Sequence, residues 1–529
     1  MIKRFTIKDL ALNVSIVLLM IFSFSCNKKL EITPEHAYGQ AVAWNTMDDI
    51  NSNFFAVYAL FRATMATNND YLLWGELRGG DFASVQRADL KAVIDGNLNA
   101  PFPQLDEMRD WRRFYAVINA ANLFIERSPE VLKKDGRYTQ ALQLVDVAHM
   151  RCLRAWAYFM LVRIWGDVPL LTSSYEGQFP TVARTDKSLV LGFCEKELLS
   201  AMDYLPFYYG GSDPIQSGNY HNYDFSRFST TIVGRLGAYG LLAHIAAWQG
   251  RYADVDVYAK FVMDYMSQGR LTYSTTADIT ASNGVFKGRG QVGSDNRMLL
   301  GFTLFWDHGE TGTSGFGHIE SWTLATPYVA KSVPDLYVPS DSITLMFNDP
   351  QDQRFRFDTV QTSVVDSTRR VVAQGKYIEP STFFSATPMF TKIKVFTSGK
   401  TTDLFAVFGS NIMFSRMEEI ALLRAEACAA IGNTTDALSI LNGRRANRGE
   451  AGYDAKKDGD LIDAVFMERR RELLGEAWRW YDLVRYNKLK RTNPAFNKLI
   501  DQGGIYWPVS TAVMEANPLI KQNPYWEGK

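Results

Sequence analysis

The chain has 529 residues, 47% of them hydrophobic, and its 57 lysines and arginines are balanced by 57 aspartates and glutamates. This apolar content is sufficient for a large buried core, and the lack of a basic excess disfavours nucleic acid as a partner. The four cysteines and six histidines are scattered without the spacing of a metal or redox motif, so we predict no metal site and no cofactor.

Residues 1–25 have the pattern of a bacterial lipoprotein signal peptide. A positively charged start precedes the mainly apolar stretch Ala11–Phe24, which is shorter than the roughly 20 residues of a comfortable membrane span. Small residues stand one and three positions before Cys26, as signal cleavage requires. We therefore predict a membrane anchor of palmitate-like acyl chains on Cys26, since two or more chains anchor a protein stably. The alternative is an ordinary secretory signal followed by a chance cysteine.

Apolar residues recur at helical spacing in two parts of the chain, roughly 40–270 and 411–490. The predicted helices are Asp48–Ala63, Trp111–Glu126, Val147–Trp165, Thr230–Trp248, Tyr252–Met266, Phe414–Ile431 and Thr434–Arg445. The last four form two pairs with short turns at Gly250 and Gly432. Each pair has roughly the size of a tetratricopeptide unit, and such units stack to bury a continuous core. We predict a mainly α fold of tetratricopeptide-like helix pairs, forming one domain over 26–529.

Two regions lack this periodicity. Asp70–Asp81 ends in Gly79 and Gly80 and is predicted to be a loop. Residues 271–410 are richer in Gly, Ser and Thr, and we predict an irregular region with short elements packed on the scaffold. Within it, Thr362–Tyr377 alternates like a β-hairpin with its turn near Asp366 and Ser367. Residues 491–529 close the chain.

Phe466–Leu489 combines strong charges with large aromatic rings, and we predict a single long helix because Gly475 is its only helix breaker. Four opposite-charge pairs stand three residues apart and can meet on one helix surface: Glu468–Arg471, Glu476–Arg479, Arg479–Asp482 and Asp482–Arg485. Arg470 falls among apolar positions and must be paired or reach water. The run Arg469–Arg471 could contact nucleic acid, but the interleaved acids favour a structural helix.

The same stretch resembles the C-terminal signature of the SusD/RagB family, which is close to ERRRELxxEGxRWxDLxRW. The matching positions are Glu468–Leu473, Glu476, Arg479, Trp480, Asp482, Leu483 and Arg485. Further similarity covers nearly the whole chain and includes Gly75–Arg78, Trp165–Pro169 and Trp507–Tyr525. Members are surface nutrient-binding lipoproteins that sit over a TonB-dependent, SusC-like outer-membrane transporter. The resemblance implies that fold, that partner and a lipid anchor facing the cell exterior, although Lys28 and Lys29 replace the acidic residues common after the cysteine.

No convincing catalytic constellation is present, and Asp349 and Asp352 are more simply residues of a turn that positions the hairpin. Aromatic residues make up 13% of the chain, which suits either stacking on sugar rings or a helical core. Tryptophans on the scaffold helices are predicted to be core. Rings in loop-like stretches, with polar neighbours for sugar hydroxyls, are the candidate ligand contacts: Trp74 with Arg78 and Asp81, Trp306 with His308, Trp322, and Tyr328.

We therefore predict a non-enzymatic protein that binds an oligosaccharide and delivers it to the transporter. The alternatives are a peptide-capturing member of the same family and an all-α surface glycan hydrolase, which would release new reducing ends.

Overall fold

The computed structural model describes residues 43–67, 70–177, 179–209, 213–223, 232–287, 291–292, 295–305, 309–311, 318–361, 369–400 and 403–528. The predicted signal peptide and Cys26 lie outside these residues. So do Trp306, His308 and the predicted hairpin turn at Asp366 and Ser367.

Long helices form the scaffold, and their bounds follow the periodic segments of the sequence. They are α2 (Met47–Ala66), α6 (Arg112–Lys134), α7 (Gln140–Trp165), α8 (Lys187–Ala201), α9 (Arg235–Gln249), α10 (Tyr252–Asp264), α14 (Met417–Ala430) and α15 (Thr434–Ala446). Local signals set their ends: Thr46 and Asp49 form a capping box at the start of α2, and Gly250 turns α9 into α10 in a left-handed conformation.

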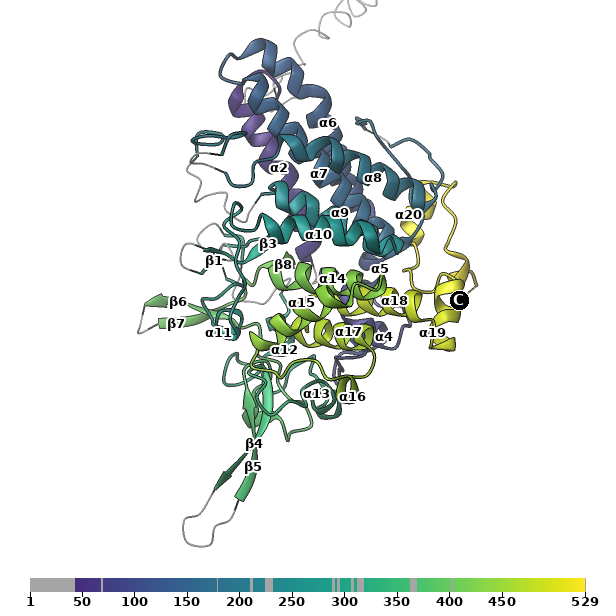
Figure 1. The fold of residues 1–529 in the computed structure, drawn as a ribbon. Helices are drawn as coiled ribbons and strands as arrows, with labels where there is room; N and C mark the ends of the chain where they lie inside the picture. Colours follow the sequence, from purple (N-terminus) through teal and green to yellow (C-terminus); the bar gives the residue numbers. More distant parts are fainter. Residues whose placement is uncertain are drawn as a thin grey trace, which may run out of the picture.

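These helices stack in sequence order, each on its neighbour (Figure 1). α2 packs on α6, α6 on α7, α7 on α8 and α9 on α10, while α10 packs on α14, from the second helical part of the chain. One hydrophobic cluster runs through the stack and includes Trp44, Trp156 and Trp526. The predicted mainly α fold of stacked helix pairs is confirmed.

The middle of the chain contains short strands that pair in antiparallel twos. β3 (Met298–Phe302) pairs with β8 (Ile412–Arg416), so the two ends of this region meet directly before α14. Phe414 therefore lies in a strand and not in the predicted helix, because β8 takes up the residues that precede Met417. The other pairs are β1 (Gln291–Val292) with β2 (Asp295–Asn296), and β6 (Phe396–Lys400) with β7 (Asp403–Val407).

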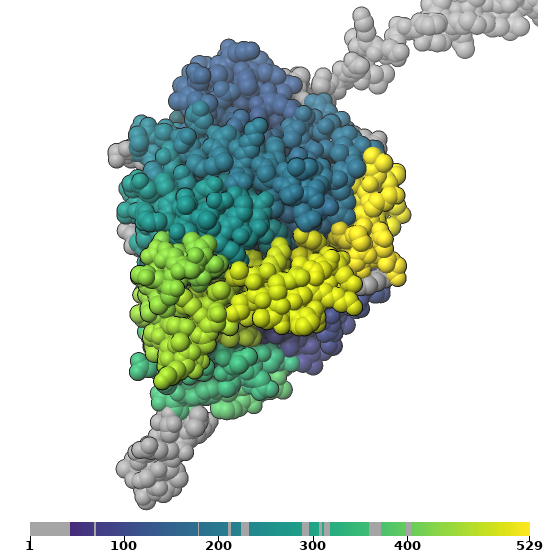
Figure 2. All heavy atoms as spheres, turned by 45° about the vertical axis from the view of Figure 1, so that its right-hand side comes forward, coloured from purple at the N-terminus to yellow at the C-terminus, as the bar shows by residue number. Residues whose placement is uncertain are grey.

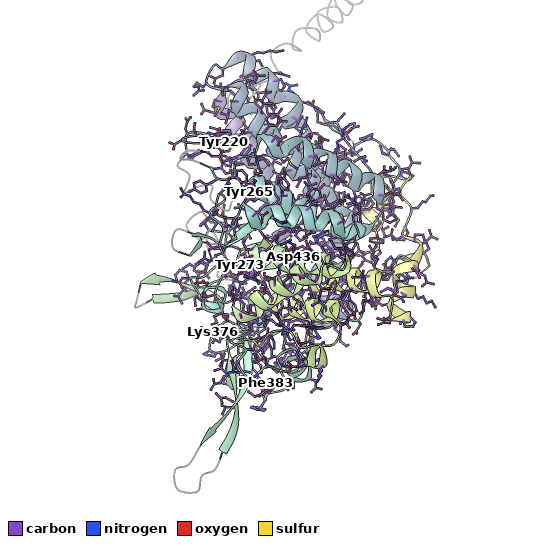
Figure 3. All side chains as sticks on the ribbon, in the orientation of Figure 1. Tyr220, Tyr265, Tyr273, Lys376, Phe383 and Asp436 are labelled. Atoms are coloured by element: carbon purple, nitrogen blue, oxygen red, sulfur yellow. The ribbon has the colours of Figure 1, made fainter. Side chains whose placement is uncertain are left out.

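The predicted hairpin exists, but its first strand begins earlier than the alternation suggested. β4 (Phe355–Gln361) pairs with β5 (Arg369–Gly375) over its full length. The strand starts at Phe355 because this ring is buried and, with Phe357, packs against Phe383 at ring-centroid distances of 5.1 Å. Figure 3 labels Phe383 near the base of this hairpin, which projects from the body in Figure 1.

Short helices connect these parts. They are α3 (Asp70–Gly75), η2 (Leu77–Gly79), α4 (Ala88–Ile94), α5 (Pro103–Met108), η3 (Met202–Tyr204), α11 (Thr276–Thr280), α12 (Glu320–Thr323), α13 (Ser340–Met346), η6 (Pro380–Thr382), α16 (Ala455–Asp458), α19 (Pro494–Asp501), α20 (Thr511–Ala516) and η7 (Pro524–Trp526). The yellow C-terminal segment lies against the blue helices (Figure 2). Asn523 holds it there by donating hydrogen bonds to the carbonyls of Trp165 and Trp507.

The single helix predicted over Phe466–Leu489 is wrong. The structure has two helices, α17 (Leu461–Glu472) and α18 (Arg479–Lys490), joined by a turn in which Gly475 and Ala477 have φ of 78° and 62°. The turn fits against another segment: a Cβ at Gly75 would lie 2.0 Å from the carbonyl oxygen of Ala477. A tertiary contact therefore overrides the helical pattern.

The break also redistributes the predicted charge pairs. Glu468–Arg471 and Asp482–Arg485 form within their helices, at 2.8 and 2.7 Å. Glu476 instead pairs with Lys392 and Arg416. Arg479, predicted to meet Glu476 and Asp482, pairs instead with Asp81, while Asp482 pairs with Arg469 and Arg485.

Arg470 is paired as predicted, with Nε 2.9 Å from Asp81. Its neighbours Arg469 and Arg471 are 0% and 4% exposed and hold carboxylates inside the protein. The structural interpretation of this arginine run is therefore favoured, since a phosphate backbone would need exposed cations.

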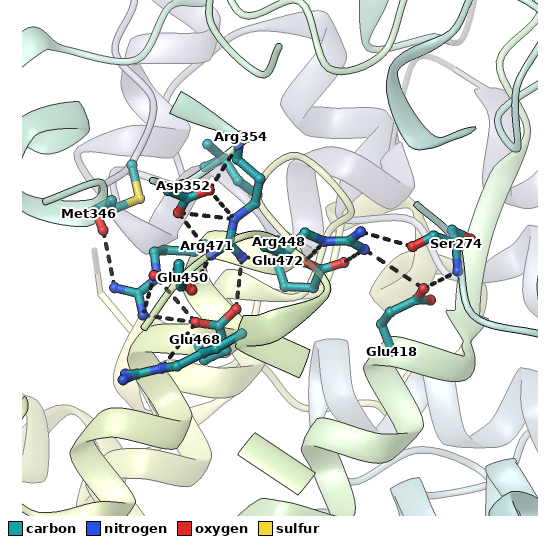
Figure 4. Close-up of polar contacts among 12 residues, drawn as sticks. Ser274, Met346, Asp352, Arg354, Glu418, Arg448, Glu450, Glu468, Arg471 and Glu472 are labelled. Atoms are coloured by element: carbon teal, nitrogen blue, oxygen red, sulfur yellow. Dashed lines mark hydrogen bonds and ion pairs between the residues drawn. The ribbon is translucent and has the colours of Figure 1, made fainter. Parts of the chain in front are cut away.

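A buried ion network joins α17 to the irregular middle (Figure 4). Arg354 is fully buried and contacts Asp352, Glu450, Glu468 and Glu472 at 2.6–3.3 Å. Asp352 thus holds Arg354 at the start of β4, as expected of a residue that positions the hairpin. The network orients a segment with little regular structure of its own.

Removing one partner of this network should destabilise the protein strongly. Glu476 joins the network through Arg416, which also contacts Glu472. Glu476→Ala leaves Lys392 buried without its carboxylate and removes one of the carboxylates around Arg416, which should lower the free energy of unfolding by roughly 3–5 kcal/mol. Asp264→Ala is the matched control, because it breaks the exposed Lys260–Asp264 pair and should cost only about 0–1 kcal/mol. Urea unfolding measures the free energy of unfolding of both variants. A similarly small decrease in both would contradict the structural role of the network.

Candidate functional site

The segment predicted as a loop at Asp70–Asp81 is mostly helical, and its tryptophan belongs to the core. Trp74 lies in α3 and is 2% exposed. Its Nε1 donates to the carbonyl of Met108 at 3.3 Å, and its ring packs on those of Phe114 and Trp165. No face of this ring is open to a sugar, so the structure gives Trp74 a packing role.

Arg78 and Asp81 likewise contact other parts of the protein: Arg78 contacts α18 and the segment after α19, and Asp81 contacts arginines of α17 and α18. The Arg78 guanidinium lies 3.8 Å from the Trp480 ring centroid and donates to the carbonyls of Gly504 and Ile505. Burial lowers the pKa of Arg78 to about 9. Asp81 is 1% exposed and pairs with Arg470 and Arg479. Both predicted ligand contacts are thus occupied by protein partners.

The loop between Gly80 and α4 nevertheless reaches the irregular middle, as the proposed ligand face requires. Ala83 and Tyr337 exchange two backbone hydrogen bonds, of 2.8 and 3.1 Å. The Leu336 amide donates to the carbonyl of Trp322 in α12. Trp322 is only 8% exposed, and the guanidinium of Arg87 lies 5.9 Å from its ring centroid. Trp322 is therefore a buried side chain of the junction between this loop and the irregular middle.

Tyr328 is the described candidate ring that remains partly exposed. Its hydroxyl donates to Glu379 Oε2 at 2.8 Å, while Glu379 Oε1 accepts from the Ser381 hydroxyl. Burial raises the pKa of Tyr328 to about 12, with a further contribution from Glu379. The ring rests on a small apolar cluster that includes Leu324 and Met389.

Two cations meet at Asp335, in the same segment as Tyr328. Lys331 Nζ contacts Asp335 at 2.7 Å and the carbonyl of Ser321 at 2.7 Å. Arg87 pairs with Asp89 at 2.6 Å, and its side chain is 35% exposed. Phe384, beside Phe383, is 67% exposed. We call the surface formed by Arg87, Tyr328, Lys331, Glu379 and Phe384 the loop face.

The loop face combines a half-exposed phenol and an exposed phenyl ring with carboxylate, ammonium and guanidinium groups. Rings of this kind stack on the apolar faces of sugars, and the charged groups can hydrogen-bond to hydroxyls. Among the described residues, no cluster of three His, Cys, Asp or Glu side chains could hold a metal ion. No helix in the described part of the chain is sufficiently long and apolar to cross a membrane.

Comparison with known proteins identifies the family. The model of the SusD family matches residues 216–503. A solved SusD superfamily protein from Bacteroides thetaiotaomicron is 41% identical, with a TM-score of 0.80, and the match covers 91% of this chain and 99% of that protein. This chain belongs to the SusD family.

Other members extend this result. SusD-like protein P38 of Formosa agariphila is 26% identical over 540 residues, covering 97% of this chain and 99% of that protein. A second solved SusD homologue from B. thetaiotaomicron has a TM-score of 0.70 at 21% identity, with 92% of this chain and 99% of that protein covered, and shares the fold. SusD proteins are in general surface glycan-binding proteins and not enzymes.

Sequence reasoning missed most of the loop face. Arg87, Lys331, Glu379 and Phe384 were not candidates, because no motif marks them and they meet only in the folded chain. Of these four residues, only Lys331 lies close in sequence to Trp322 and Tyr328, and that closeness was a weak signal for it. Trp306 and His308 lie outside the described residues and stay predicted contacts.

Glu76, also missed, is a buried acid beside the turn of α17 and α18. It is fully buried, Oε1 accepts a 2.9 Å hydrogen bond from the Gly475 amide, and Oε2 has no hydrogen-bond partner. Burial, with a smaller effect of Asp81, raises the pKa of Glu76 to about 8 from an ordinary value of 4.5. The folded protein therefore holds this carboxyl protonated at neutral pH.

This shift predicts a pH-dependent stability. The folded state binds the Glu76 proton more tightly than the unfolded state, so the contribution is complete below pH 4.5 and is lost as the pH rises to about 8. Glu76→Gln keeps a neutral amide in place of the acid and should flatten the change in unfolding free energy across this range. Urea unfolding from pH 5 to 8 measures the unfolding free energy of the wild type and the variant. Equal slopes of this free energy against pH would show that Glu76 is ionised in the folded protein.

Proposed function

We propose that this SusD protein is a cell-surface lipoprotein that captures an oligosaccharide at the loop face and delivers it to a partner TonB-dependent transporter. The proposal is supported by the pairing of Ala83 with Tyr337, which joins loop 81–88 to residues 318–338, and by the hydrogen bond from Tyr328 to Glu379. Family membership supports glycan as the ligand and a SusC-like transporter as the partner.

The arrangement of this surface supports binding without bond cleavage. The carboxylates of the loop face are engaged: Glu379 accepts from Tyr328 and Ser381, and Asp335 pairs with Lys331. Carboxylates with these partners orient the neighbouring side chains and can accept hydrogen bonds from sugar hydroxyls. Trp306 and His308 lie outside the described residues and stay proposed ligand contacts.

Loss of the Tyr328 ring should weaken capture. Tyr328→Ala should reduce oligosaccharide affinity by about tenfold, equivalent to about 1.4 kcal/mol, because a stacked ring and a hydrogen-bonding hydroxyl are both removed. Tyr328→Phe, which keeps the ring, should lose less. Calorimetric titration after a screen of polysaccharides and peptides measures the effect.

Tyr204→Ala is the matched control, because Tyr204 is 43% exposed in η3 and contributes nothing to the loop face. A melting curve for each variant separates binding from folding. Normal oligosaccharide binding by a folded Tyr328→Ala variant would show that the ligand site does not include Tyr328. Selective binding of peptides would establish the peptide-capturing alternative, and new reducing ends released from a glycan would establish the hydrolase.

The proposed lipid anchor on Cys26 has a separate test. Cys26→Ala should abolish membrane attachment in the native host and leave a folded protein, since the thiol is the acceptor of the first lipid. Detergent-phase partition of the wild type and the variant measures attachment. Retention of the variant in the detergent phase would contradict a lipid on Cys26.

A further inference from the structure

A hollow lies in the helical scaffold and shares no residue with the loop face. It has a volume of about 680 Å³ and opens where the start of α8, the α9–α10 turn and the end of α18 converge. Pockets for small ligands commonly have volumes of about 300–1,000 Å³. In Figure 2 the late, yellow segments lie against the teal and blue helices along this side of the molecule.

Its walls are aromatic and its charged groups are cations. Trp248, Tyr252 and Tyr506 supply rings, and Lys187, Arg485 and Lys488 supply positive charge. Tyr252 and Tyr506 are partly exposed, so their surfaces are open to a ligand. Among the residues that the structure describes, no aspartate or glutamate lines the hollow.

The three cations differ in how they are neutralised. Arg485 is buried and fully engaged by Glu426 and Asp482 at 2.7–2.8 Å. Lys187 lies 3.4 Å from Asp167 and 3.9 Å from Asp186, and its side chain is 44% exposed. Its charge is thus only loosely compensated.

Lys488 has no carboxylate within 4 Å among the described residues. Its Nζ donates to the carbonyl of Trp248 at 3.3 Å and lies 4.3 Å from that indole's centroid. Its near neighbour Lys490, by contrast, pairs with Asp460 and Asp463 at 3.3 and 3.1 Å. Two ammonium protons of Lys488 are therefore available to an anion that enters the exposed hollow.

The electrostatics agree with this geometry. Loss of surrounding water lowers the pKa of Lys488 to about 8, and the like charges of Arg485 and Lys187 lower it further. An anion beside Lys488 would relieve this repulsion and form a charge-assisted hydrogen bond. The Gln249 amide, whose oxygen accepts from Arg251, still offers its NH₂ group to a hydroxyl.

We propose that this hollow is a second sugar-binding site, and that it takes a sugar unit bearing a carboxylate or a sulfate. The anionic group would sit between Lys488 and Lys187, the pyranose would lie against Tyr252 and Tyr506, and Gln249 would bind a hydroxyl. A neutral sugar would leave the Lys488 ammonium without an anion. The choice of a sugar as the ligand rests on the proposed function; the choice of an anion rests on the cations.

Titration calorimetry of the full chain at low salt tests the site, with digalacturonate, galactose 6-sulfate and neutral galactobiose as probes. At least one anionic probe should bind about tenfold or more tightly than galactobiose, the range of a hydrogen bond to a charged group. Lys488→Gln should remove this preference. The matched control Lys490→Gln, two residues along the same helix, should retain it, and Leu191→Trp should block binding by filling the hollow.

Several outcomes would overturn the proposal. These are no binding of either anionic probe, equal affinity for galactobiose, or an unchanged preference in Lys488→Gln. Equal affinity for inorganic sulfate and galactose 6-sulfate would show that the hollow does not recognise the sugar ring. Tighter binding of tetraglutamate than of the anionic sugars would show that the hollow binds an acidic peptide. Tyr328→Ala should leave the anionic probes unaffected: dependence on Tyr328 with indifference to Lys488 would refute this site and support the loop face.

Discussion

Glu472 is the residue on which the arrangement of the irregular region depends. Its carboxylate contacts Arg354 before β4, Arg416 before α14 and Arg448 after α15, at 2.7–3.3 Å. Three segments far apart in sequence are thereby fixed to the end of α17. A buried ion pair is stabilising only when its geometry satisfies both partners, and removing one partner is costly. The network thus specifies one arrangement for a part of the chain that lacks a helical core of its own.

The turn that follows Glu472 transmits this order to the loop face. Ala477 fits against Gly75, the Gly475 amide donates to the Glu76 carboxyl, and Arg470 and Arg479 hold Asp81. Asp81 stands directly before the loop whose Ala83 pairs with Tyr337. The chain from Glu472 to Asp81 to Tyr337 is therefore a continuous set of contacts between the buried network and the surface around Tyr328. Charged groups of the family signature act here as supports and not as ligands.

The sequence predicted those features that are determined locally. The 3.6-residue period located the scaffold helices, and spacing alone found the Glu468–Arg471 pair. The break after Glu472 was not predictable in this way, because it results from a contact between Ala477 and Gly75. Trp74 was assigned to a loop because the six-residue helix α3 is too short to show a period. The loop face depends on pairing between distant segments, so only Tyr328 of its five residues could be named from the sequence.

The partners of the cationic side chains distinguish structural residues from the residues of a binding site. Arg354 and Arg469 are buried among carboxylates. Arg78, which has no carboxylate within 4 Å in the described part of the chain, donates to two backbone carbonyls and lies over an indole. In each case the fold supplies the acceptors, as the cost of burying a charge requires. Lys488 departs from this pattern, since it has one carbonyl acceptor, lies beside two further cations and faces an open hollow with aromatic walls. Lys488 is an exposed residue with no carboxylate within 4 Å among the described residues, so its ammonium is accessible from outside, and an anion with a ring to stack is the ligand that these walls fit.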